Sequence, residues 1–378
     1  MKSYGKQTIS DADIKSVAAV MRSEMLTQGP AVDLAEKEFC EKLEVNHCVL
    51  VNSATSALHL AMLALGVGEG STVWTVSNTF VASANAPRYS GADLGFCDIN
   101  LETLNIDVDN LRDSLERSSL NGSLPDAVIV VHFAGSSCEM FAIRQLSVKF
   151  NFRVIEDASH AVGGKYLDRY IGNCLYSDAC IFSFHPVKII TSGEGGAVTT
   201  NDEDVSRKVK LLRSHGVSRE KANFSWEYEQ KLLGYNYRMP DINAALLRSQ
   251  LLKLDEFVNK RNALAQLYKD AFRGTQISVQ LIPSENLSAY HLFTVALPIK
   301  SLEEKEKFKT FLLESGIGTQ VHYIPVHTQS FHMGSTLLSD MRNTNLNYVR
   351  TLSLPLYPAL EQSDVHFIIN KIRSYKFD

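Results

Sequence analysis

The chain has 378 residues, of which 45% are hydrophobic and 21% are charged, and it carries a net charge of −4. These proportions are those of an ordinary soluble globular protein, and the length allows one large and one smaller domain. The charge gives no support to nucleic-acid binding, which needs a clustered basic face. No run of eighteen or more apolar residues occurs, so we expect no membrane span.

The cysteines and the first residues predict a location. Six cysteines are scattered along the chain without a C-x-x-C pair, which favours reduced thiols in the core over a disulfide framework or a metal site. Residues 1–15 contain no apolar stretch of the kind found in signal peptides. We therefore expect a cytoplasmic protein without a metal ion.

Predicted elements alternate between strand and helix from residue 47 onward. Helical patterns at 11–23 and 32–43 come first. Strands are predicted at 48–51, 73–76, 94–99, 127–132, 153–156 and 179–184, and the intervening helices at 54–65, 80–89, 109–116 and 137–150. Such alternation predicts a mostly parallel sheet with helices on both faces and with ligands at the carboxyl ends of its strands.

The second half of the chain predicts a helical bridge to another domain. A helix runs from about residue 202 to His215, where Gly216 suits its end. One long amphipathic helix is predicted over 240–272. Strands at 291–297 and 319–323 and helices at 302–315 and 362–375 follow it. We expect a large α/β domain over 1–249 and a smaller α+β domain over 250–378.

The strand-to-helix junction at 51–57 is the first candidate binding site. Small hydroxylated residues at a helix start leave backbone N–H groups open, and the helix dipole there favours a phosphate. Ordinary capping by Ser53 or Thr55 explains the same pattern, and the junction alone favours that explanation. The glycines at 66–70 follow a helix and precede a strand, the reverse of a dinucleotide-binding fingerprint, so we interpret them as a turn.

Three further side chains stand near predicted strand ends. Phe80 follows a strand at a place where an aromatic ring stacks on a heterocycle, although most such phenylalanines belong to the core. Asp157 ends an apolar strand, where its carboxylate needs a cation such as a protonated pyridine nitrogen, and His160 follows it. Capping of the next turn explains Asp157 about equally well.

Lys188 lies between two apolar strand-like runs, in the stretch IFSFHPVKIITSGEGGAVTT at 181–200. A loop lysine that reaches solvent is the ordinary explanation, because burial of an unpaired ammonium costs several kcal/mol. The alternative is a lysine whose amine is tuned by burial to form a Schiff base with a cofactor aldehyde.

The ordered combination of these motifs resembles the sugar aminotransferase family, over essentially the whole chain. The resemblance rests on 26–30 (LTQGP), 53–57 (SATSA), Asp157, 183–188 (SFHPVK), 194–196 (EGG), 213–216 (RSHG), 234–239 (GYNYRM) and 322–325 (HYIP). It implies the fold of aspartate aminotransferase and the cofactor pyridoxal 5′-phosphate.

The resemblance also implies a role for each site residue. Lys188 forms the Schiff base, Asp157 pairs with the pyridinium nitrogen, His160 lies near the phenolic oxygen and Phe80 stacks on the ring. The phosphate is held by Ala54, Thr55, Ser183 and Asn236, the last from a neighbouring subunit, which implies a homodimer. The nucleotide-sugar site is lined by Tyr4, Glu24, Met25, Leu26, Thr27, His322, Tyr323, Ile324 and Pro325, and Arg238 receives the carboxylate of the amino donor.

Within the family, 52–56 (NSATS), 131–135 (VHFAG) and 156–160 (EDASH) resemble the branch that acts in pseudaminic acid biosynthesis. This likeness implies transamination of UDP-2-acetamido-2,6-dideoxy-β-L-arabino-hex-4-ulose at C4, with L-glutamate as donor. A GDP- or dTDP-linked 4-keto sugar stays open as the substrate. Dehydration at C3 is disfavoured, since relatives with that activity carry histidine where this chain has Lys188. A non-catalytic regulator is a third alternative, and no basic tail supports it.

Overall fold

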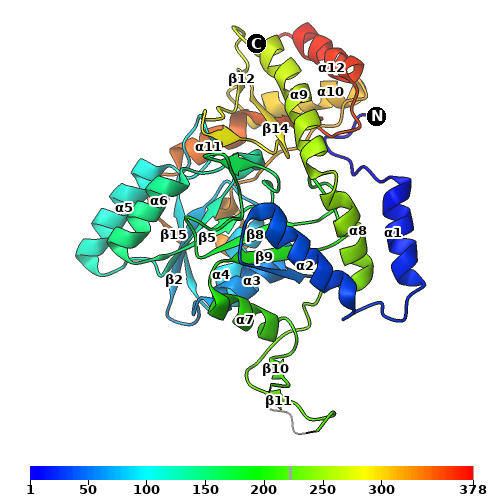
Figure 1. Cartoon of the computed structure of the whole chain (residues 1–378). Coiled ribbons are helices and arrows are strands. Elements are labelled where there is room, and N and C mark those ends of the chain that lie inside the picture. Colours follow the sequence, from blue (N-terminus) through cyan, green and yellow to red (C-terminus); the bar gives the residue numbers. More distant parts are fainter. Residues whose placement is uncertain (221–223, 378) are drawn as a thin grey trace.

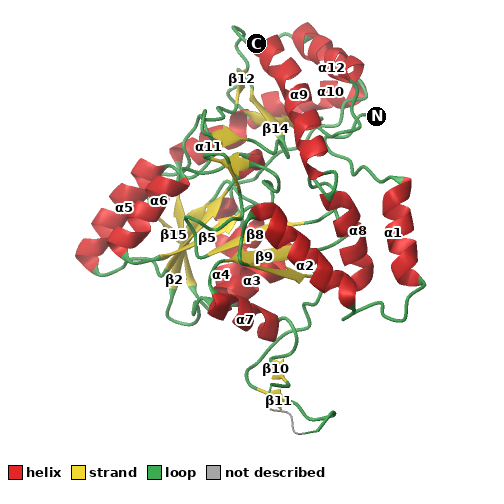
Figure 2. Cartoon of the chain, viewed as in Figure 1, coloured by secondary structure: helices red, strands yellow, loops and turns green. Residues whose placement is uncertain are grey.

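The computed structural model describes residues 1–220 and 224–377, and within them the chain is built around one eight-stranded sheet (Figures 1 and 2). The strand order is β1-β9-β8-β5-β4-β2-β3-β15. β9 is antiparallel to both of its neighbours, and the pairs from β8 to β15 are parallel. The strands are β1 (His47–Val51), β2 (Thr72–Val76), β3 (Asp93–Cys97), β4 (Ala127–Val131), β5 (Arg153–Asp157), β8 (Ala179–Ser183), β9 (Gly196–Thr200) and β15 (Thr336–Leu337). The expected mostly parallel sheet is confirmed.

Helices cover both faces of this sheet, because alternate strand residues point to opposite sides. The helices are α2 (Pro30–Leu43), α3 (Ala54–Ala64), α4 (Val81–Tyr89), α5 (Val108–Asn121), α6 (Met140–Phe150), α7 (Glu203–Leu212) and α8 (Asp241–Leu251). Ile129 and Ile155 pack under α3, α4 and α7. Val128 and Val154 pack under α5 and α6, and Phe182 packs under α2 and α8. Every residue of β4 is buried, which explains why its sequence is continuously apolar.

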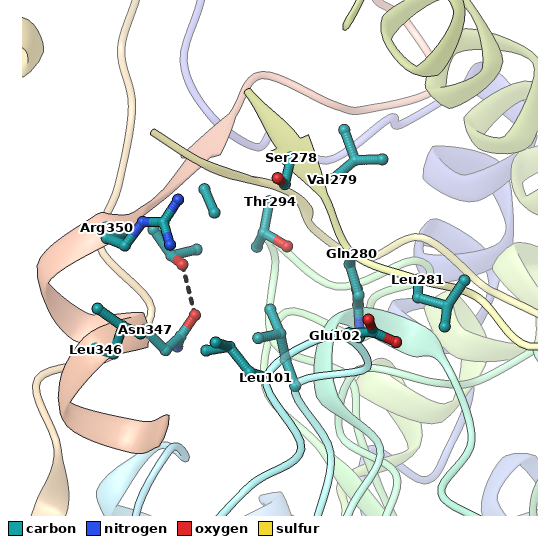
Figure 3. A pocket seen from close by; sticks show the side chains of 13 residues that line it. Leu101, Glu102, Ser278, Val279, Gln280, Leu281, Thr294, Leu346, Asn347 and Arg350 are labelled. Carbon is teal, nitrogen blue, oxygen red and sulfur yellow. Dashed lines mark hydrogen bonds between the residues drawn. The ribbon is translucent and has the colours of Figure 1, made fainter. Parts of the chain in front are cut away.

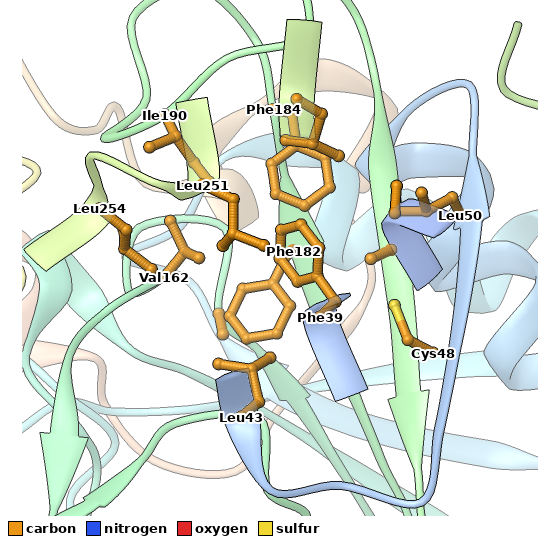
Figure 4. Close-up of a cluster of buried hydrophobic side chains, with 14 of the residues drawn as sticks. Phe39, Leu43, Cys48, Leu50, Val162, Phe182, Phe184, Ile190, Leu251 and Leu254 are labelled. Atoms are coloured by element: carbon orange, nitrogen blue, oxygen red, sulfur yellow. The ribbon is translucent and has the colours of Figure 1, made fainter. Parts of the chain in front are cut away.

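An aromatic cluster lies beneath α2 and the junction of α8 with α9 (Leu254–Phe272) (Figure 4). The rings of Phe39 and Phe184 have centroids 5.3 Å apart, and both side chains are fully buried together with Phe182. Leu254 packs into the same cluster. Since Phe184 follows directly after β8, the cluster anchors the start of the loop that carries Lys188.

The single helix predicted over 240–272 is wrong, because the chain breaks between α8 and α9. Leu252 is 89% exposed at the break, and Lys253 has φ −102° and ψ 1°. The ammonium of Lys253 donates at 2.5 Å to Asp13, a fully buried residue of α1 (Asp11–Met21). The break lets α8 lie along α1 while α9 continues toward the C-terminal elements (Figure 1). The helix predicted to reach His215 likewise ends earlier, at Leu212.

The C-terminal elements form a second core around a three-stranded antiparallel sheet, in the order β12-β14-β16. They are β12 (Ser278–Val279), β14 (Phe293–Ala296), β16 (Thr351–Leu354), α10 (Leu302–Glu314), α11 (Arg342–Arg350) and α12 (Gln362–Ser374). The predicted strand at 319–323 is wrong: Gln320 forms an isolated bridge with Ser353, and His322 bonds to the hydroxyl of Ser353 instead of continuing a ladder. The domain division at 1–249 and 250–378 stays a prediction, and β15 pairs with β3 across it.

Short elements complete the described chain: β6 (Lys165–Tyr166), β7 (Arg169–Tyr170), β10 (Val217–Ser218), β11 (Glu229–Gln230), β13 (Asn286–Leu287), η1 (Phe133–Gly135), η2 (Val326–Thr328) and η3 (Ser330–His332). All six cysteines lie in the described residues and are free thiols. None of the described helices is long and apolar enough to cross a membrane.

Candidate active site

A pocket of about 880 Å³ opens at the carboxyl ends of the central strands. Asp157 ends β5, Ser183 ends β8, and Asn52 follows β1, and all three line it. From the other side, Tyr4 and residues 320–323 close the pocket. The site therefore lies where an open α/β sheet binds its ligands.

Lys188 lies in this pocket, on the loop between β8 and β9. Its backbone N–H donates to the carbonyl of His185 at 2.9 Å, and Phe184 and Ser192 close the loop through a 3.0 Å bond. Burial lowers the pKa of the Lys188 amine to about 8, although the Asp157 carboxylate opposes this shift. A lysine on a solvated loop keeps its charge at neutral pH, whereas this amine is partly neutral and able to act as a nucleophile.

The Asp157 carboxylate is held from two sides and is only 5% exposed. The hydroxyl of Ser83, on the first turn of α4, donates to Oδ2 at 2.6 Å, and the backbone N–H of Ser159 donates to Oδ1 at 3.1 Å. Each carboxylate oxygen can accept more than one bond. Asp157 thus keeps acceptor capacity for a cationic N–H in the pocket.

The N-terminus of α3 points its free N–H groups into the pocket at Ala54 and Thr55. Ser53 caps the helix by accepting from the N–H of Ser56 at 3.1 Å, so the cap explanation also holds. Gly196, the first residue of β9, lies so close that a Cβ there would be 2.5 Å from the Ser53 carbonyl and 2.6 Å from the Ala54 nitrogen. The site thus has a helix N-terminus suited to an anion.

Aromatic side chains form the remaining wall. Phe80 is 58% exposed as the N-cap of α4, and its ring centroid lies 6.0 Å from that of Tyr323. His160 is 5% exposed, and its Nε2 lies 3.0 Å from the Tyr323 hydroxyl. The 58% exposed ring of Phe80 offers a stacking surface to a flat ring in the pocket.

The sequence profile of the DegT/DnrJ/EryC1/StrS aminotransferase family matches residues 7–373. The chain belongs to this family. A UDP-4-amino-4,6-dideoxy-N-acetyl-beta-L-altrosamine transaminase of Campylobacter jejuni is 40% identical over 371 residues, which cover 97% of this chain and 96% of the relative. The spore coat polysaccharide biosynthesis protein SpsC of Bacillus subtilis is 37% identical over 98% of this chain and 96% of its own.

Solved structures agree with the family. Helicobacter pylori PseC, an aminotransferase of pseudaminic acid biosynthesis, superposes with a TM-score of 0.91 at 31% identity and covers 98% of both chains. A sugar aminotransferase of Streptococcus pneumoniae in its PLP form, Spr1654, has a TM-score of 0.89 at 26% identity, over 98% of this chain and 97% of its own. The chain is therefore a PLP-dependent nucleotide-sugar aminotransferase with the fold of aspartate aminotransferase, as the resemblance implied.

The residues present fit pyridoxal 5′-phosphate. Lys188 supplies an amine of lowered pKa, and Asp157 supplies a fixed carboxylate. The α3 N-terminus supplies donors for a phosphate, and Phe80 supplies an exposed ring. One lysine and no arginine line the pocket within the described residues, so the helix N-terminus offers a phosphate donors that no arginine of this lining supplies.

The pocket gathers ten of the predicted site residues: Tyr4, Ala54, Thr55, Phe80, Asp157, His160, Ser183, Lys188, His322 and Tyr323. Eight others lie outside the lining of this chain's pocket: Glu24, Met25, Leu26, Thr27, Asn236, Arg238, Ile324 and Pro325. Residues 24–27 and Asn236 are exposed, and Arg238 donates to the hydroxyl of Ser214 at 3.1 Å. Their roles stay predictions.

Sequence reasoning missed several residues of the pocket. Ser83 holds Asp157 but lies in a helix whose sequence shows no site motif. His291 is 4% exposed beside His160, and Gln320 and Val321 line the pocket within the segment taken for a strand. Ser83 lies in the first turn of α4, seven residues after β2 ends at Val76, and no local sequence pattern marks its place in the pocket.

A second hollow of about 340 Å³ lies away from Lys188 (Figure 3). Leu346, Asn347 and Arg350 of α11 face β12 and Thr294 of β14 across it. It lacks a lysine and a helix N-terminus among its described lining residues, so it does not suit the cofactor.

Proposed function

We propose that this aminotransferase transfers an amino group from L-glutamate to C4 of UDP-2-acetamido-2,6-dideoxy-β-L-arabino-hex-4-ulose. The product is UDP-4-amino-4,6-dideoxy-N-acetyl-β-L-altrosamine, an intermediate of pseudaminic acid biosynthesis. The observation that carries the proposal is the 39–40% identity, over 97% of the chain, to two Campylobacter jejuni transaminases named for this product.

The chemistry divides between cofactor and protein. Bound pyridoxal 5′-phosphate supplies the aldehyde that takes up the amino group and a ring that draws electrons from the reacting carbon. Lys188 provides the nucleophilic amine and, once released, holds and returns the proton at its Nζ. Asp157 orients the ring nitrogen through its carboxylate, and Ser83 and Ser159 keep that carboxylate in place.

We infer that a second copy of the chain completes the site. The amino donor carries two carboxylates, and no arginine lines the pocket within the described residues. Arg238 lies two residues after Asn236, which is exposed. Between them, the carbonyl of Tyr237 accepts a 2.9 Å bond from the N–H of Asn52, the residue that precedes the α3 cap. A homodimer in which this segment reaches the neighbouring pocket supplies both the phosphate contact and the donor's cation.

Exposed aromatic side chains support the same partner. Phe224, Trp226 and Tyr228 are 58%, 73% and 62% exposed on the segment that projects from the body of the molecule with β10 and β11 (Figure 1). The rings of Phe224 and Trp226 stack with centroids 5.0 Å apart. Contiguous exposed apolar groups of this size favour a protein interface.

The cytoplasmic location also stays a prediction.

The sugar is tested with purified protein and a panel of UDP-, GDP- and dTDP-linked 4-keto-6-deoxy sugars plus glutamate, with products read by NMR. We expect amination of the UDP-linked sugar, and amination of a GDP- or dTDP-linked sugar alone would contradict the substrate while leaving the family unchanged.

Lys188→Ala is expected to fold and to lose turnover. A loss of water from C3 in place of amination would support the dehydration alternative, which the presence of Lys188 disfavours.

A further inference from the structure

The second hollow, of about 340 Å³, has walls from two parts of the chain that are bonded to each other (Figure 3). One wall is the loop that follows β3, and the other is formed by α11 and the C-terminal sheet. The N–H of Leu281 donates to the carbonyl of Glu102 at 2.9 Å, and the amide of Gln280 donates to the carbonyl of Thr103 at 2.7 Å. These bonds hold the two walls together. The volume lies at the small end of the roughly 300–1,000 Å³ that is usual for ligand pockets.

One face of the C-terminal sheet turns small side chains toward this hollow. In the pairing of β14 with β16, Thr294 lies opposite Ser353 and Ala296 lies opposite Thr351, so these four side chains share a face. The alternate residues of both strands point the other way, into the second core. Thr294, Ala296 and Thr351 line the hollow. The face that meets the hollow therefore carries hydroxyl groups in place of large apolar side chains.

The hydroxyl of Thr294 differs from the other two on this face. The Thr351 hydroxyl donates to Asn347, and the Ser353 hydroxyl lies 2.8 Å from Nδ1 of His322. Thr294 is 3% exposed, yet its Oγ1 has no hydrogen-bond partner within residues 1–220 and 224–377. A buried hydroxyl without a partner destabilises a fold. A ligand in the hollow would give Thr294 the partner that the protein does not supply.

Arg350 brings a positive charge to the same hollow. Its Nε donates to the carbonyl of Leu297 at 3.1 Å, which orients the guanidinium. No ion pair of Arg350 occurs in the part of the chain that the structure describes. Figure 3 shows the guanidinium turned from α11 toward the hollow. Because the planar fork of an arginine binds a carboxylate through two parallel bonds, its terminal nitrogens suit such an anion.

The remaining lining limits what the ligand can be. The amide of Asn347 is already engaged, since its oxygen accepts from Thr351 and its nitrogen donates to Asn78 at 3.2 Å. Glu102 is the one acidic residue among the described lining residues, so a doubly charged phosphate would meet one cation and one anion. The larger apolar side chains of the lining are Leu101, Leu104, Val279, Leu281 and Leu346. A single carboxylate on an apolar body matches this combination.

We propose that the second hollow is a binding site for a small monocarboxylate with an apolar body. The carboxylate accepts bonds from the terminal nitrogens of Arg350 and from the hydroxyl of Thr294, and the apolar body lies against the leucines. None of the described residues that line this hollow also lines the active pocket. The site is therefore separate from the cofactor, and the proposal is independent of which sugar is aminated.

The test is a calorimetric titration of the PLP-loaded protein with 3-phenylpropanoate. The matched probe is 3-phenylpropanamide, which has the same shape without the charge. We expect the acid to bind with a Kd of about 1 mM or tighter. The amide is expected to bind about tenfold more weakly or worse, because it forms no charge-assisted bond with a guanidinium. Absence of binding by the acid overturns the proposal, and equal affinity for acid and amide does so as well.

Inorganic phosphate separates the ligand class from a general anion site. It is expected to leave the affinity for 3-phenylpropanoate unchanged at constant ionic strength, because phosphate has no apolar body and a second negative charge. Displacement of the acid by phosphate contradicts a monocarboxylate site.

Two variants locate the bound acid. Thr294→Val keeps the shape of the side chain and removes the hydroxyl, so the affinity is expected to fall about tenfold. Its thermal unfolding midpoint is expected to stay or to rise, because a buried polar atom without a partner is removed. Arg350→Gln is expected to lower the affinity about tenfold or more. Unchanged affinity in either variant places the acid elsewhere, the active pocket included, and overturns the proposal.

Each variant has a matched control. Oγ1 of Thr319 is likewise buried and without a partner among the described residues, but Thr319 lines neither pocket, so Thr319→Val is compared with Thr294→Val. Arg342 lies on the same helix as Arg350 with an 82% exposed side chain, so Arg342→Gln is compared with Arg350→Gln. Unchanged affinity is expected in both controls. A loss equal to that of the matched variant overturns the assignment to the hollow.

Ala296→Leu tests the hollow without removing a polar group. Its larger side chain points into the hollow and fills part of it, so binding of 3-phenylpropanoate is expected to be lost. The rate of the glutamate half-reaction is expected to stay unchanged, because Ala296 is outside the active pocket. Retained affinity in this variant contradicts the proposal even where Arg350→Gln fails to fold.

Discussion

The pKa of Lys188 differs from that of an ordinary lysine because the fold buries its amine. Burial between two strands and the turn at His185 lowers the pKa of its amine to about 8. The neutral, reactive form is therefore populated near neutral pH, which a lysine at its ordinary pKa of 10.5 does not achieve. This shift would let Lys188 attack an aldehyde near neutral pH.

The pKa of Lys188 predicts how cofactor-free protein takes up pyridoxal 5′-phosphate. The rate is expected to rise about fivefold between pH 7 and pH 8 and to level off above about pH 9, because the neutral fraction of the amine follows a pKa of about 8. Stopped-flow absorbance at constant ionic strength measures it. A rate that keeps rising tenfold per pH unit up to pH 10 would contradict the lowered pKa.

A shared pocket could be predicted where a side chain ends a strand. Asp157 and Ser183 end β5 and β8 and line the same pocket, and Lys188 lines it from the loop that follows β8. Ser83 and His291 reach the same pocket from elements that are distant in sequence, and their contacts depend on tertiary packing that no local pattern encodes.

The contact between β9 and α3 predicts the effect of one methyl group. Gly196→Ala places a Cβ 2.5 Å from the Ser53 carbonyl, so the helix start must move away. We expect the affinity for pyridoxal 5′-phosphate to fall and the protein to lose about 1–3 kcal/mol of stability. Equilibrium dialysis and urea unfolding measure the two effects.

Gly68→Ala is the matched control for Gly196→Ala. The nearest atom to its Cβ is the Ser90 carbonyl oxygen at 3.8 Å, and its backbone is not left-handed. Unchanged affinity is expected there, and unchanged affinity in Gly196→Ala would refute the role of the close approach.

The buried carboxylate of Asp13 bonds helix α1 to α8 and to Lys253. Asp13 accepts bonds from Lys253 at 2.5 Å, Ser249 at 2.7 Å and the Ser10 N–H at 2.7 Å. Burial opposes its charge, yet these bonds together lower the pKa of Asp13 to about 2. Since the folded pKa lies below the ordinary 3.8, the stabilisation is complete above pH 3.8 and is lost as the pH falls through 2.

Asp13→Asn is therefore expected to cost about 2–4 kcal/mol at pH 7, because it leaves Lys253 without its buried partner. The difference from the unmodified protein should shrink toward pH 2. Urea unfolding at several pH values measures it, with the exposed Asp11→Asn as control. Equal losses at pH 2 and pH 7 would count against the ion pair.

Elements were predicted well where local pattern and packing agree. Six strands of the large sheet (β1, β2, β3, β4, β5 and β8) lie within a few residues of their expected positions, whereas β15 was not predicted. The break at Leu252 and Lys253 carries no glycine or proline, and its cause is the distant Asp13. The segment at 319–323 looks like a strand in composition, but its residues serve the pocket through His322 and Tyr323.

At the scale of the whole molecule, the proposed dimer predicts complementation between two inactive proteins. Lys188→Ala keeps Asn236, and Asn236→Ala keeps Lys188, so a mixed dimer contains one intact site if the two residues meet across the interface. Random mixing after dissociation is expected to restore about a quarter of the unmodified activity. Each variant alone, taken through the same dissociation, is the control, and no recovery on mixing would place Asn236 outside the neighbouring site.

The strand order has a consequence for synthesis of the chain. β1 occupies an edge of the sheet and pairs with β9, which is made roughly 150 residues later, or about 7 to 30 s at usual translation rates. Until then the apolar residues Cys48–Val51 lack their neighbouring strand in the sheet. The N-terminus of α3 likewise lacks the contact with Gly196 of β9. The nascent protein must therefore keep this apolar strand from pairing with other chains throughout that interval.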